Sequence, residues 1–421
     1  MLKMIKLEKG LEERIAKNLR ASIEEKIPIE DVLRIVKEVK EKGDRAVIFF
    51  EEKYDGAKLT CEDLRVREEE MIKAVKNIPP RLLMSFKKAK QRLETAEKTF
   101  LKNFPTKVKV ELDGVTIVYE LKPVKRVGIY TPRSKISYPS SLIMSATPAQ
   151  IAGVKSIAVA TPPDSKGNVD EGVLAVCHIL GIKEVYKIGG AQAIAALAYG
   201  TETVKPVEII VGPGGRYVTA AKHIISANTS IEFLAGPTEL LILADETANP
   251  KFVAYDLASQ AEHGSDSIII LATNSEDLVN RVLKFMQSLD NGKHVIKQLK
   301  VVLGEIESLI KFSETFAPEH IQIMGDIVEK FSEKIEKAGL ILIGEYTPTA
   351  ASDYILGTNH VLPTYGLAAA KGGLSPLSFM KRVVKVKASR GGLLKLKDDG
   401  IRLATKENLY GHAKALEVRF S

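Results

Sequence analysis

The stretch that decides the fold is EVYKIGGAQAIAALAYG, residues 184–200. It opens with a short apolar run, passes through Gly189 and Gly190, and continues as a longer segment rich in alanine. A short β-branched or aromatic run, a glycine turn and a helix-forming segment are typical of one βα unit. We therefore predict a strand that ends before Gly189 and a helix that begins after Gly190.

The same unit recurs along the chain. The further predicted strands are RVGIY (126–130), SIAVATP (156–162), VEIIV (207–211), ELLILAD (239–245), DSIIILAT (266–273) and GLILIG (339–344). Helical patterns follow most of them, so the sequence predicts an α/β fold with parallel sheets covered on both faces. Ligands of such sheets bind beyond the carboxyl ends of the strands.

The ends of the chain have a different texture. Residues 1–105 are mostly helical in pattern, and Asp113-Gly114 marks the turn of a hairpin within residues 107–123. The last forty-odd residues lack the short apolar runs typical of strands, and we predict that they form a basic, partly helical tail. A chain of 421 residues exceeds one ordinary core, so we expect two or more domains.

The composition is that of a soluble globular protein, with 45% hydrophobic and 27% charged residues. No apolar run approaches the roughly 20 residues of a membrane span, and the charged N-terminal segment lacks the apolar core of a signal peptide. Cys61 and Cys177 are too few for a disulfide framework, and we interpret both as buried thiols. We expect a cytoplasmic protein with no membrane partner.

The formal net charge of +8 raises the possibility of a nucleic-acid partner. Most basic residues alternate with acidic ones along the predicted helices, which favours an ion-paired surface instead. Only residues 381–397 are one-sidedly basic. We therefore expect no nucleic-acid partner.

Two side chains at the end of a predicted helix are candidate ligands. Gln260 and His263 lie three residues apart, which places them on one helix face. A histidine at a helix C-terminus also gains from the helix dipole, so a packed or capping role is the simpler interpretation. A metal needs more donors, and the candidates elsewhere are Asp353, His360 and His412. Spacing alone does not show that these residues meet.

Two further features fit catalysis or binding. The glycine turns at residues 189–190 and 212–215 suit a phosphate at a helix N-terminus. Neither is a G-x-G-x-x-G motif, however, and plain tight turns are the favoured explanation. Pro318 predicts a loop that carries Glu319 and His320, both competent acid–base groups. An ordinary polar loop is the alternative.

Taken together and in order, eight segments resemble the histidinol dehydrogenase family. They are RVGIY, YPSSLIMSATPAQIAGV, IGGAQAIAALAYGT, LAGPTELLILAD, SQAEHG, APEHI, SDYILGTNHVLPTYG and GHAKALEVR. The resemblance implies oxidation of L-histidinol through L-histidinal to L-histidine with two NAD+ reduced, the last step of histidine biosynthesis. It also implies two incomplete Rossmann-like parallel-sheet domains, two small, mainly helical terminal domains, and an intertwined homodimer.

Mapped onto this chain, the resemblance assigns residues 25–129 and 239–374 to the first Rossmann-like domain and 130–238 to the second. Residues 1–24 and 375–421 become the terminal pieces. The C-terminal piece of each subunit is expected to reach the active site of the partner.

The resemblance also implies the site residues. One Zn²⁺ per site is held by Gln260, His263, Asp353 and His412, which also contact the substrate. His320 is the base that takes the alcohol proton, and Glu319 activates the water that hydrates the aldehyde. Thr238, where the family has Ser, and Glu407 bind the substrate, as His320 does, and His360 lies in the same region.

For NAD the resemblance points to Tyr130, Gln192 and Gly215. The chain departs from the family here, because Gly215 stands where Asn is usual and Pro132-Arg133-Ser134 replaces Pro-Gly-Gly. Arg133 is therefore a candidate contact for a cofactor phosphate. Two rival functions are a metal-dependent hydrolase, with Glu319 activating a zinc-bound water, and a nucleic-acid-binding module built on the basic tail.

Overall fold

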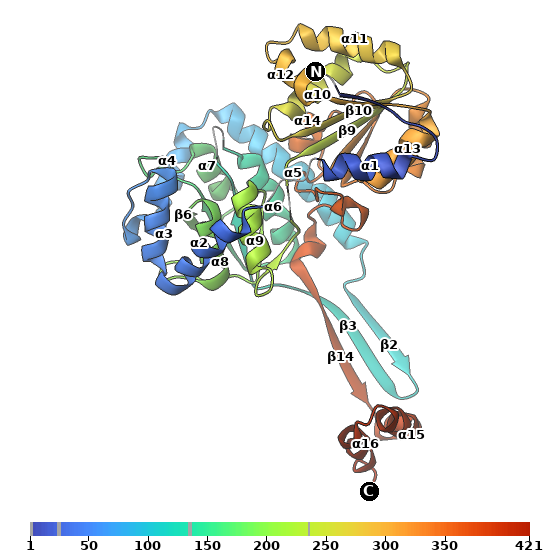
Figure 1. The fold of residues 1–421 in the computed structure, drawn as a ribbon. Coiled ribbons are helices and arrows are strands. Elements are labelled where there is room, and N and C mark those ends of the chain that lie inside the picture. Colours follow the sequence, from blue (N-terminus) through green and yellow to red (C-terminus); the bar gives the residue numbers. More distant parts are fainter. Residues whose placement is uncertain (1–2, 23–26, 134–136, 235) are drawn as a thin grey trace. The chain divides into compact units, whose positions relative to one another are not determined.

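The computed structural model describes residues 3–22, 27–133, 137–234 and 236–421. The chain divides into two compact units (Figure 1). Unit 1 comprises residues 1–98 and 125–379, and unit 2 comprises residues 99–124 and 380–421. Within the described ranges, no helix combines the length and the apolar character that crossing a membrane requires.

Unit 1 contains two parallel sheets. The six-stranded sheet has the order β1 (Lys3–Lys6), β11 (Lys300–Leu303), β10 (Ile268–Thr273), β9 (Glu239–Ala244), β12 (His320–Met324) and β13 (Leu340–Ile343). The five-stranded sheet has the order β6 (Glu184–Lys187), β5 (Ser156–Thr161), β4 (Arg126–Tyr130), β7 (Ile209–Val211) and β8 (Ser230–Ile231). The predicted α/β class with parallel sheets is confirmed.

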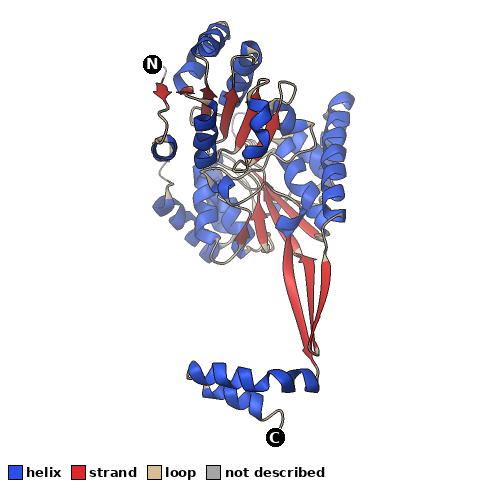
Figure 2. Ribbon diagram, turned by 90° about the vertical axis from the view of Figure 1, so that its right-hand side faces the viewer, coloured by secondary structure: helices blue, strands red, loops and turns tan. Residues whose placement is uncertain are grey.

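Helices cover both faces of the six-stranded sheet (Figure 2). They are α1 (Glu12–Ala21), α10 (Pro250–Ala261), α11 (Glu276–Gln287), α12 (Gly292–Gln298), α13 (Ile306–Phe316) and α14 (Thr349–Tyr354), with the short helix η3 (Val328–Lys334). Two further short helices are η4 (Leu367–Ala369) and η5 (Pro376–Phe379), and η5 packs on α6 (Pro139–Ala152). Alternate residues of β9 serve the two cores, since Leu240 packs with the α10 and α11 side and Leu241 with the α1 and α13 side. This explains why the strand is apolar throughout.

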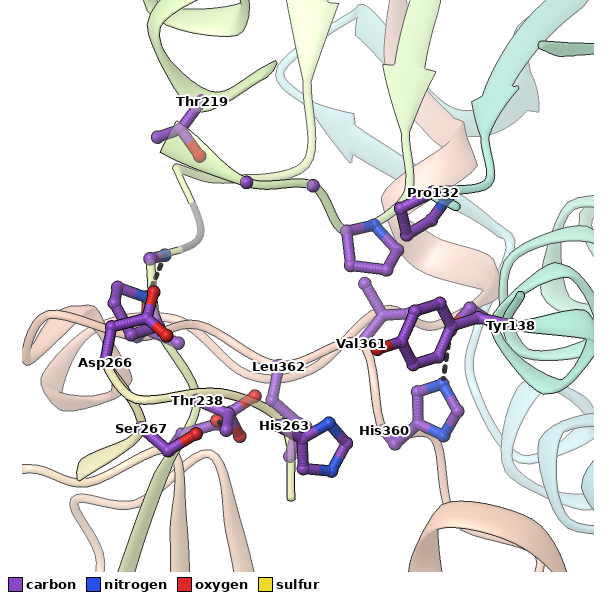
Figure 3. Close-up of a pocket in the computed structure, with 18 of the residues that line it drawn as sticks. Pro132, Tyr138, Thr219, Thr238, His263, Asp266, Ser267, His360, Val361 and Leu362 are labelled. Atoms are coloured by element: carbon purple, nitrogen blue, oxygen red, sulfur yellow. Dashed lines mark hydrogen bonds between the residues drawn. The ribbon is translucent and has the colours of Figure 1, made fainter. Parts of the chain in front are cut away.

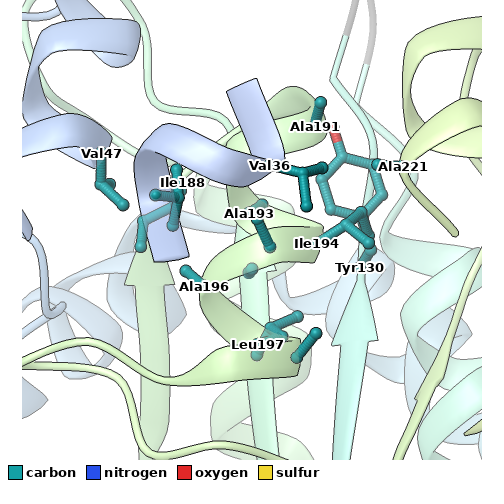
Figure 4. Close-up of a cluster of buried hydrophobic side chains, with 14 of the residues drawn as sticks. Val36, Val47, Tyr130, Ile188, Ala191, Ala193, Ile194, Ala196, Leu197 and Ala221 are labelled. Atoms are coloured by element: carbon teal, nitrogen blue, oxygen red, sulfur yellow. The ribbon is translucent and has the colours of Figure 1, made fainter. Parts of the chain in front are cut away.

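The remaining helices of unit 1 belong mainly with the five-stranded sheet. They are α2 (Ile29–Lys42), α3 (Asp44–Phe50), the π-helix η1 (Glu51–Asp55), η2 (Cys61–Asp63), α4 (Glu68–Asn77), α5 (Pro80–Lys102), α6 (Pro139–Ala152), α7 (Glu171–Ile179), α8 (Gly190–Tyr199) and α9 (Arg216–Ile225). The many alanines of α8 allow α2 to pack closely against it. Val36 of α2 lies in one cluster with Ala193 and Ile194 of α8 (Figure 4).

Both sheets of unit 1 have the same topology. Numbered along the chain, the five strands of each lie in the order 3-2-1-4-5, and β1 is added at the edge of the six-stranded sheet. The direction of winding therefore reverses between β4 and β7 in one sheet and between β9 and β12 in the other. The crevice at such a reversal is where ligands of open α/β sheets bind.

The N-terminal segments are grouped differently from the expected domain map. Residues 1–24 were assigned to a separate piece, but β1 pairs with β11 and α1 packs on α13. Residues 25–129 were assigned with the six-stranded sheet, but α2 packs on α8 and α9 of the five-stranded sheet. The physical reason is the apolar face of α2, where Val32, Val36 and Val39 are buried in that core.

Unit 2 is an antiparallel sheet followed by two helices. The strand order is β14 (Met380–Ala388), β3 (Val115–Pro123) and β2 (Lys107–Leu112), and the helices are α15 (Arg390–Lys406) and α16 (Tyr410–Glu417). The predicted hairpin is confirmed, with Asp113 at φ +48° and Gly114 at φ +84° in the turn. Sequence analysis missed β14, because its many basic residues hid the alternation of Val384 and Val386.

The two cysteines are free thiols in different surroundings. Cys177 of α7 is buried, whereas Cys61 is exposed at the start of η2. The expectation of two buried thiols is therefore wrong for Cys61, which precedes Glu62 and Asp63 in a polar turn.

Candidate active site

A cavity of about 440 Å³ lies in unit 1 between its two sheets, a size typical of small-molecule sites. Figure 3 shows Pro132 and Thr219 on one side of it and Thr238 and His263 on the other. The five-stranded sheet contributes the segments after β4 and β7, and the six-stranded sheet contributes the segments before β9 and β12. The expected placement at strand carboxyl ends therefore holds for the five-stranded sheet only.

The carboxyl-end crevice of the six-stranded sheet is already filled. Asp245 follows β9 and is fully buried, and its Oδ2 accepts hydrogen bonds from the backbone N–H groups of Ile327 and Val328, both at 2.8 Å. A side-chain carboxylate thus occupies the place where a nucleotide phosphate binds in other sheets of this topology. The catalytic candidates lie at the opposite, amino-terminal ends of these strands.

Glu319 is held from two sides. Its Oε2 accepts hydrogen bonds from Thr238 Oγ1 at 2.7 Å and from the backbone N–H of Glu239 at 2.8 Å. The side chain is buried, yet it lines the cavity. The hydrogen bonds that the structure gives this carboxylate all go to Oε2, which leaves Oε1 for a ligand or a water.

His320 lies beside Glu319 on the cavity wall. It is the first residue of β12, so the prediction that both residues lie on a loop is wrong for His320. Its Nδ1 is 3.5 Å from Glu319 Oε2 and its Nε2 is 3.9 Å from Asp353 Oδ1. Both nitrogens are buried without a hydrogen-bond partner in the described part of the chain.

The electrostatics of this pair favour a basic imidazole. Burial alone lowers the pKa of His320, but the carboxylates of Glu319 and Asp353 outweigh burial, and the pKa is raised above its ordinary value. A buried imidazole with a raised pKa and unsatisfied nitrogens is suited to accept a proton from a bound molecule.

Three of the predicted metal ligands line the same cavity: Gln260 near the end of α10, His263 just beyond it, and Asp353 on α14. Gln260 Nε2 donates to Thr238 Oγ1 at 2.5 Å, so its amide oxygen is the atom left for a metal. Amide oxygen, imidazole and carboxylate suit Zn²⁺ in their chemistry. Across the described ranges, no three His, Cys, Asp or Glu side chains cluster as metal ligands.

His360 lines the same cavity. Its Nδ1 donates to the backbone oxygen of Asp353 at 2.7 Å, and its Nε2 is 3.1 Å from Ser141 Oγ. Burial lowers the pKa of His360, which favours the neutral ring. Through these two contacts His360 connects Asp353 of α14 to Ser141 of α6.

The predicted cofactor residues separate into two groups. Tyr130 and Gly215 line the cavity, together with Arg133. Gln192 is buried in α8 away from the wall, and its Nε2 donates to Glu51 Oε1 at 2.8 Å. The same Glu51 oxygen accepts from the Gly189 N–H at 2.8 Å. The Glu51 carboxyl group therefore occupies the glycine turn at 189–190, and the turn at 212–215 is the one that faces the cavity.

Glu407 and His412 belong to unit 2. Glu407 caps the C-terminus of α15, and His412 lies in α16. Asn408, at φ +60°, makes the turn between them. Both side chains are exposed.

The structure also shows participants that sequence analysis missed. Ser141 is the partner of His360, and Glu239 and Arg20 form an ion pair behind Glu319. One signal was present: Glu239 is a charged residue at the head of the fully apolar run LLILA, where a lone charge needs a buried partner. Nothing local to Arg20 marks it as that partner.

Comparisons with known proteins agree on one family. A sequence model of the family described as histidinol dehydrogenase matches residues 19–420. The protein is 37% identical to the histidinol dehydrogenase of Methanocaldococcus jannaschii, covering 100% of this chain and 98% of the relative, and 38% identical to that of Methanothermobacter thermautotrophicus, covering 94% and 95%.

A solved structure shows the same fold over the whole length. The histidinol dehydrogenase of Elizabethkingia anophelis superposes with a TM-score of 0.90 and is 34% identical, over 99% of this chain and 98% of that one. Identity at this level over full-length chains, together with the shared fold, establishes that the protein belongs to the histidinol dehydrogenase family.

Proposed function

We propose that this protein oxidises L-histidinol to L-histidine through L-histidinal, with two NAD+ reduced, and so performs the last step of histidine biosynthesis. The observation that carries the proposal is the buried Glu319–His320 pair on the cavity wall, in a chain that belongs to the histidinol dehydrogenase family. Each oxidation removes a hydride and a proton, and one water oxygen is added between them. Proton removal from the substrate and activation of the water are two different tasks for a base, and Glu319 and His320 are two neighbouring groups that can share them.

His320 is the base of both oxidations in this proposal. It accepts the hydroxyl proton as the hydride leaves the alcohol carbon, and later accepts a proton of the aldehyde hydrate. Support comes from its raised pKa and from two buried nitrogens that no described residue satisfies.

Glu319 activates water between the two oxidations. Its carboxylate accepts a proton as water adds to the aldehyde carbon, and the hydroxyl of Thr238 and the N–H of Glu239 hold Oε2 while this happens. Because the carboxylate is already held in place, the site does not have to rearrange while the water is activated.

Gln260, His263, Asp353 and His412 would hold a Zn²⁺ ion. A bound zinc ion would supply a fixed positive charge that positions the nitrogen groups of the substrate, and with them its alcohol carbon. The donor chemistry of the three cavity residues supports this assignment. Thr238 and Glu407 complete the substrate contacts.

NAD+ takes up one hydride in each oxidation. We assign it to the side of the cavity lined by Tyr130, Arg133 and Gly215, where the carboxyl ends of β4 and β7 meet at the reversal of winding. Gln192 does not line the cavity, because its amide is hydrogen-bonded to Glu51 inside the core, so we do not place it in contact with NAD+.

We further propose a homodimer whose active sites are completed by unit 2 of the partner. Among the described residues of unit 2, Ala413 is the one hydrophobic residue that is buried. Many large apolar side chains are exposed instead: Val108, Leu112, Val384, Val386, Leu394, Leu396, Leu403, Leu409, Tyr410 and Val418. A small unit with this surface gains stability by packing against another chain.

The test is a stoichiometric assay. Purified protein incubated with L-histidinol and excess NAD+ is expected to form two NADH per histidinol consumed, with L-histidine as product. His320→Ala is expected to abolish both NADH equivalents. Absence of NADH formation by the zinc-loaded protein would overturn the proposal.

A further inference from the structure

A buried ion pair behind the active site has no part in the chemistry described so far. Arg20 lies in the last turn of α1, and Glu239 is the first residue of β9. Both terminal guanidinium nitrogens of Arg20 donate to the Glu239 carboxylate, Nη1 to Oε1 and Nη2 to Oε2, the latter at 3.1 Å. The exposed fraction is 12% for the Arg20 side chain and 0% for Glu239. Neither residue lines the cavity, so neither touches a substrate there.

Arg20 anchors the chain that leads into the catalytic pair. Its Nη2 donates to the backbone oxygen of Phe316 at 2.5 Å, and its guanidinium lies 3.8 Å from the centre of the Phe316 ring. The next residue, Ala317, has φ +47°, a left-handed conformation that a non-glycine residue adopts only when its surroundings hold it there. Arg20 thus fixes the start of the strained turn that precedes Glu319.

Glu239 fixes the other end of that turn through a reciprocal pair of hydrogen bonds. Its backbone N–H donates to Glu319 Oε2 at 2.8 Å, and its own Oε2 accepts from the backbone N–H of Glu319 at 3.2 Å. One residue therefore positions both the backbone and the carboxylate of Glu319. Glu239 Oε1 also accepts from the N–H of Tyr365, a residue of the cavity wall.

The charge of Arg20 is what makes this arrangement possible. Glu239 and Glu319 are two carboxylates in contact with each other's backbone, and a buried carboxylate without a cationic partner is strongly unfavourable. The guanidinium supplies that partner for Glu239. Without it, Glu239 must take up a proton or move, and either change disturbs the two contacts through which Glu239 holds Glu319.

From these contacts we propose that Arg20 and Glu239 are positioning residues for Glu319, and that their loss slows the oxidation of the aldehyde more than that of the alcohol. The proposal rests on the role of Glu319 in water addition stated above. The hydride step of the alcohol depends on His320, which is also held by the pairing of β12 with β9 and β13. Displacing Glu319 takes the water-activating group itself out of the aldehyde step. For the alcohol step it removes only one of the two carboxylates that face His320, because Asp353 remains beside Nε2.

The test uses single turnovers of the zinc-loaded dimer, with enzyme in excess over L-histidinol, to resolve the first and second NADH formed. Arg20→Met and Glu239→Gln are expected to slow the second phase roughly tenfold to a hundredfold, the usual cost of misplacing a catalytic group by about 1 Å, and the first phase much less. Arg20→Lys keeps the charge without the two-pronged grip, and is expected to show a smaller slowing of the same phase.

The matched control is Arg14→Met, the same change on the exposed face of α1, which is expected to leave both phases at wild-type rates. Combining Arg20→Met with Glu319→Gln is expected to add little to the defect of Glu319→Gln alone, because both act on one group. If Arg20→Met does not fold, Arg20→Lys and Glu239→Gln decide the matter.

Equal slowing of both phases, or variants indistinguishable from Arg14→Met, would overturn the proposal. A wild-type protein that forms no NADH from L-histidinol would instead overturn the proposed function, so the two failures are distinguishable.

Discussion

Thr238 donates a hydrogen bond from Oγ1 to Glu319 Oε2 at 2.7 Å while the same oxygen accepts from Gln260 Nε2. One hydroxyl thus orients both the candidate water-activating carboxylate and a candidate metal ligand. We expect Thr238→Val, which keeps the shape and removes the hydroxyl, to lower kcat about tenfold to a hundredfold, the cost of a lost hydrogen bond to a charged group.

Thr238→Ser keeps the hydroxyl and is expected to stay within about threefold of the wild type in kcat. Steady-state kinetics of both variants compare the two directly. Similar losses in the valine and serine variants would show that packing, and not the hydrogen bond, explains the role of Thr238.

Removing the metal tests the ligand set. Treatment with a chelator is expected to abolish activity, and added Zn²⁺ to restore it. His263→Ala is expected to lose most of its bound zinc, measured by elemental analysis, and to lower kcat by at least about a hundredfold. His294→Ala, on the exposed side of α12, is the control and should keep its zinc. Full zinc occupancy in His263→Ala would remove His263 from the ligand set.

The buried carboxyl of Glu51 predicts a dependence of stability on pH. Burial and the neighbouring Asp55 raise the pKa of Glu51 from an ordinary value of 4.5 to about 8. The folded chain therefore keeps a proton that the unfolded chain releases, so the contribution of Glu51 is full below pH 4.5 and is lost as the pH rises through about 8. Each unit of pKa difference corresponds to about 1.4 kcal/mol.

Glu51→Gln keeps the oxygen that accepts from Gly189 and Gln192 and cannot ionise. We expect its melting temperature to fall less than that of the wild type as the pH rises from about 5 to about 9. Glu52→Gln, one residue along and exposed, should follow the wild-type curve. Parallel curves for all three proteins would contradict the prediction.

Arg133 is a cationic residue of the cavity wall, three positions after the end of β4. If it contacts a phosphate of NAD+, Arg133→Ala should raise the KM for NAD+ about tenfold and leave the KM for L-histidinol unchanged. Arg65→Ala, an exposed arginine outside this cavity, is the control. An unchanged KM for NAD+ would exclude the contact.

Sharing of sites between subunits predicts complementation. His320→Ala and His412→Ala are each expected to be inactive, since each lacks one component of every site. Refolded together, half of the dimers are mixed and each carries one intact site, so about a quarter of the wild-type activity should return. If unit 2 instead completes the site of its own chain, no activity returns on mixing.

The sequence alone determined the features that depend on neighbours in the chain. Periods of two and of three to four residues predicted the βα units, and Asp113-Gly114 predicted the hairpin that the structure shows. The cap of α10 is equally local, since Asn249 accepts from the Lys251 N–H at 3.0 Å. The resemblance of short ordered segments named the site residues, because such segments carry the chemistry itself.

Only the tertiary structure decided which distant residues meet. Arg20 and Glu239 are 219 residues apart, and Glu51 and Gln192 are 141 apart, yet each pair shares buried hydrogen bonds. The placement of the cavity at opposite strand ends of the two sheets was equally invisible in the chain. The physical reason is that local periodicity reports which face of an element is apolar, whereas the partner of a buried charge is set by packing between elements that the sequence does not order in space.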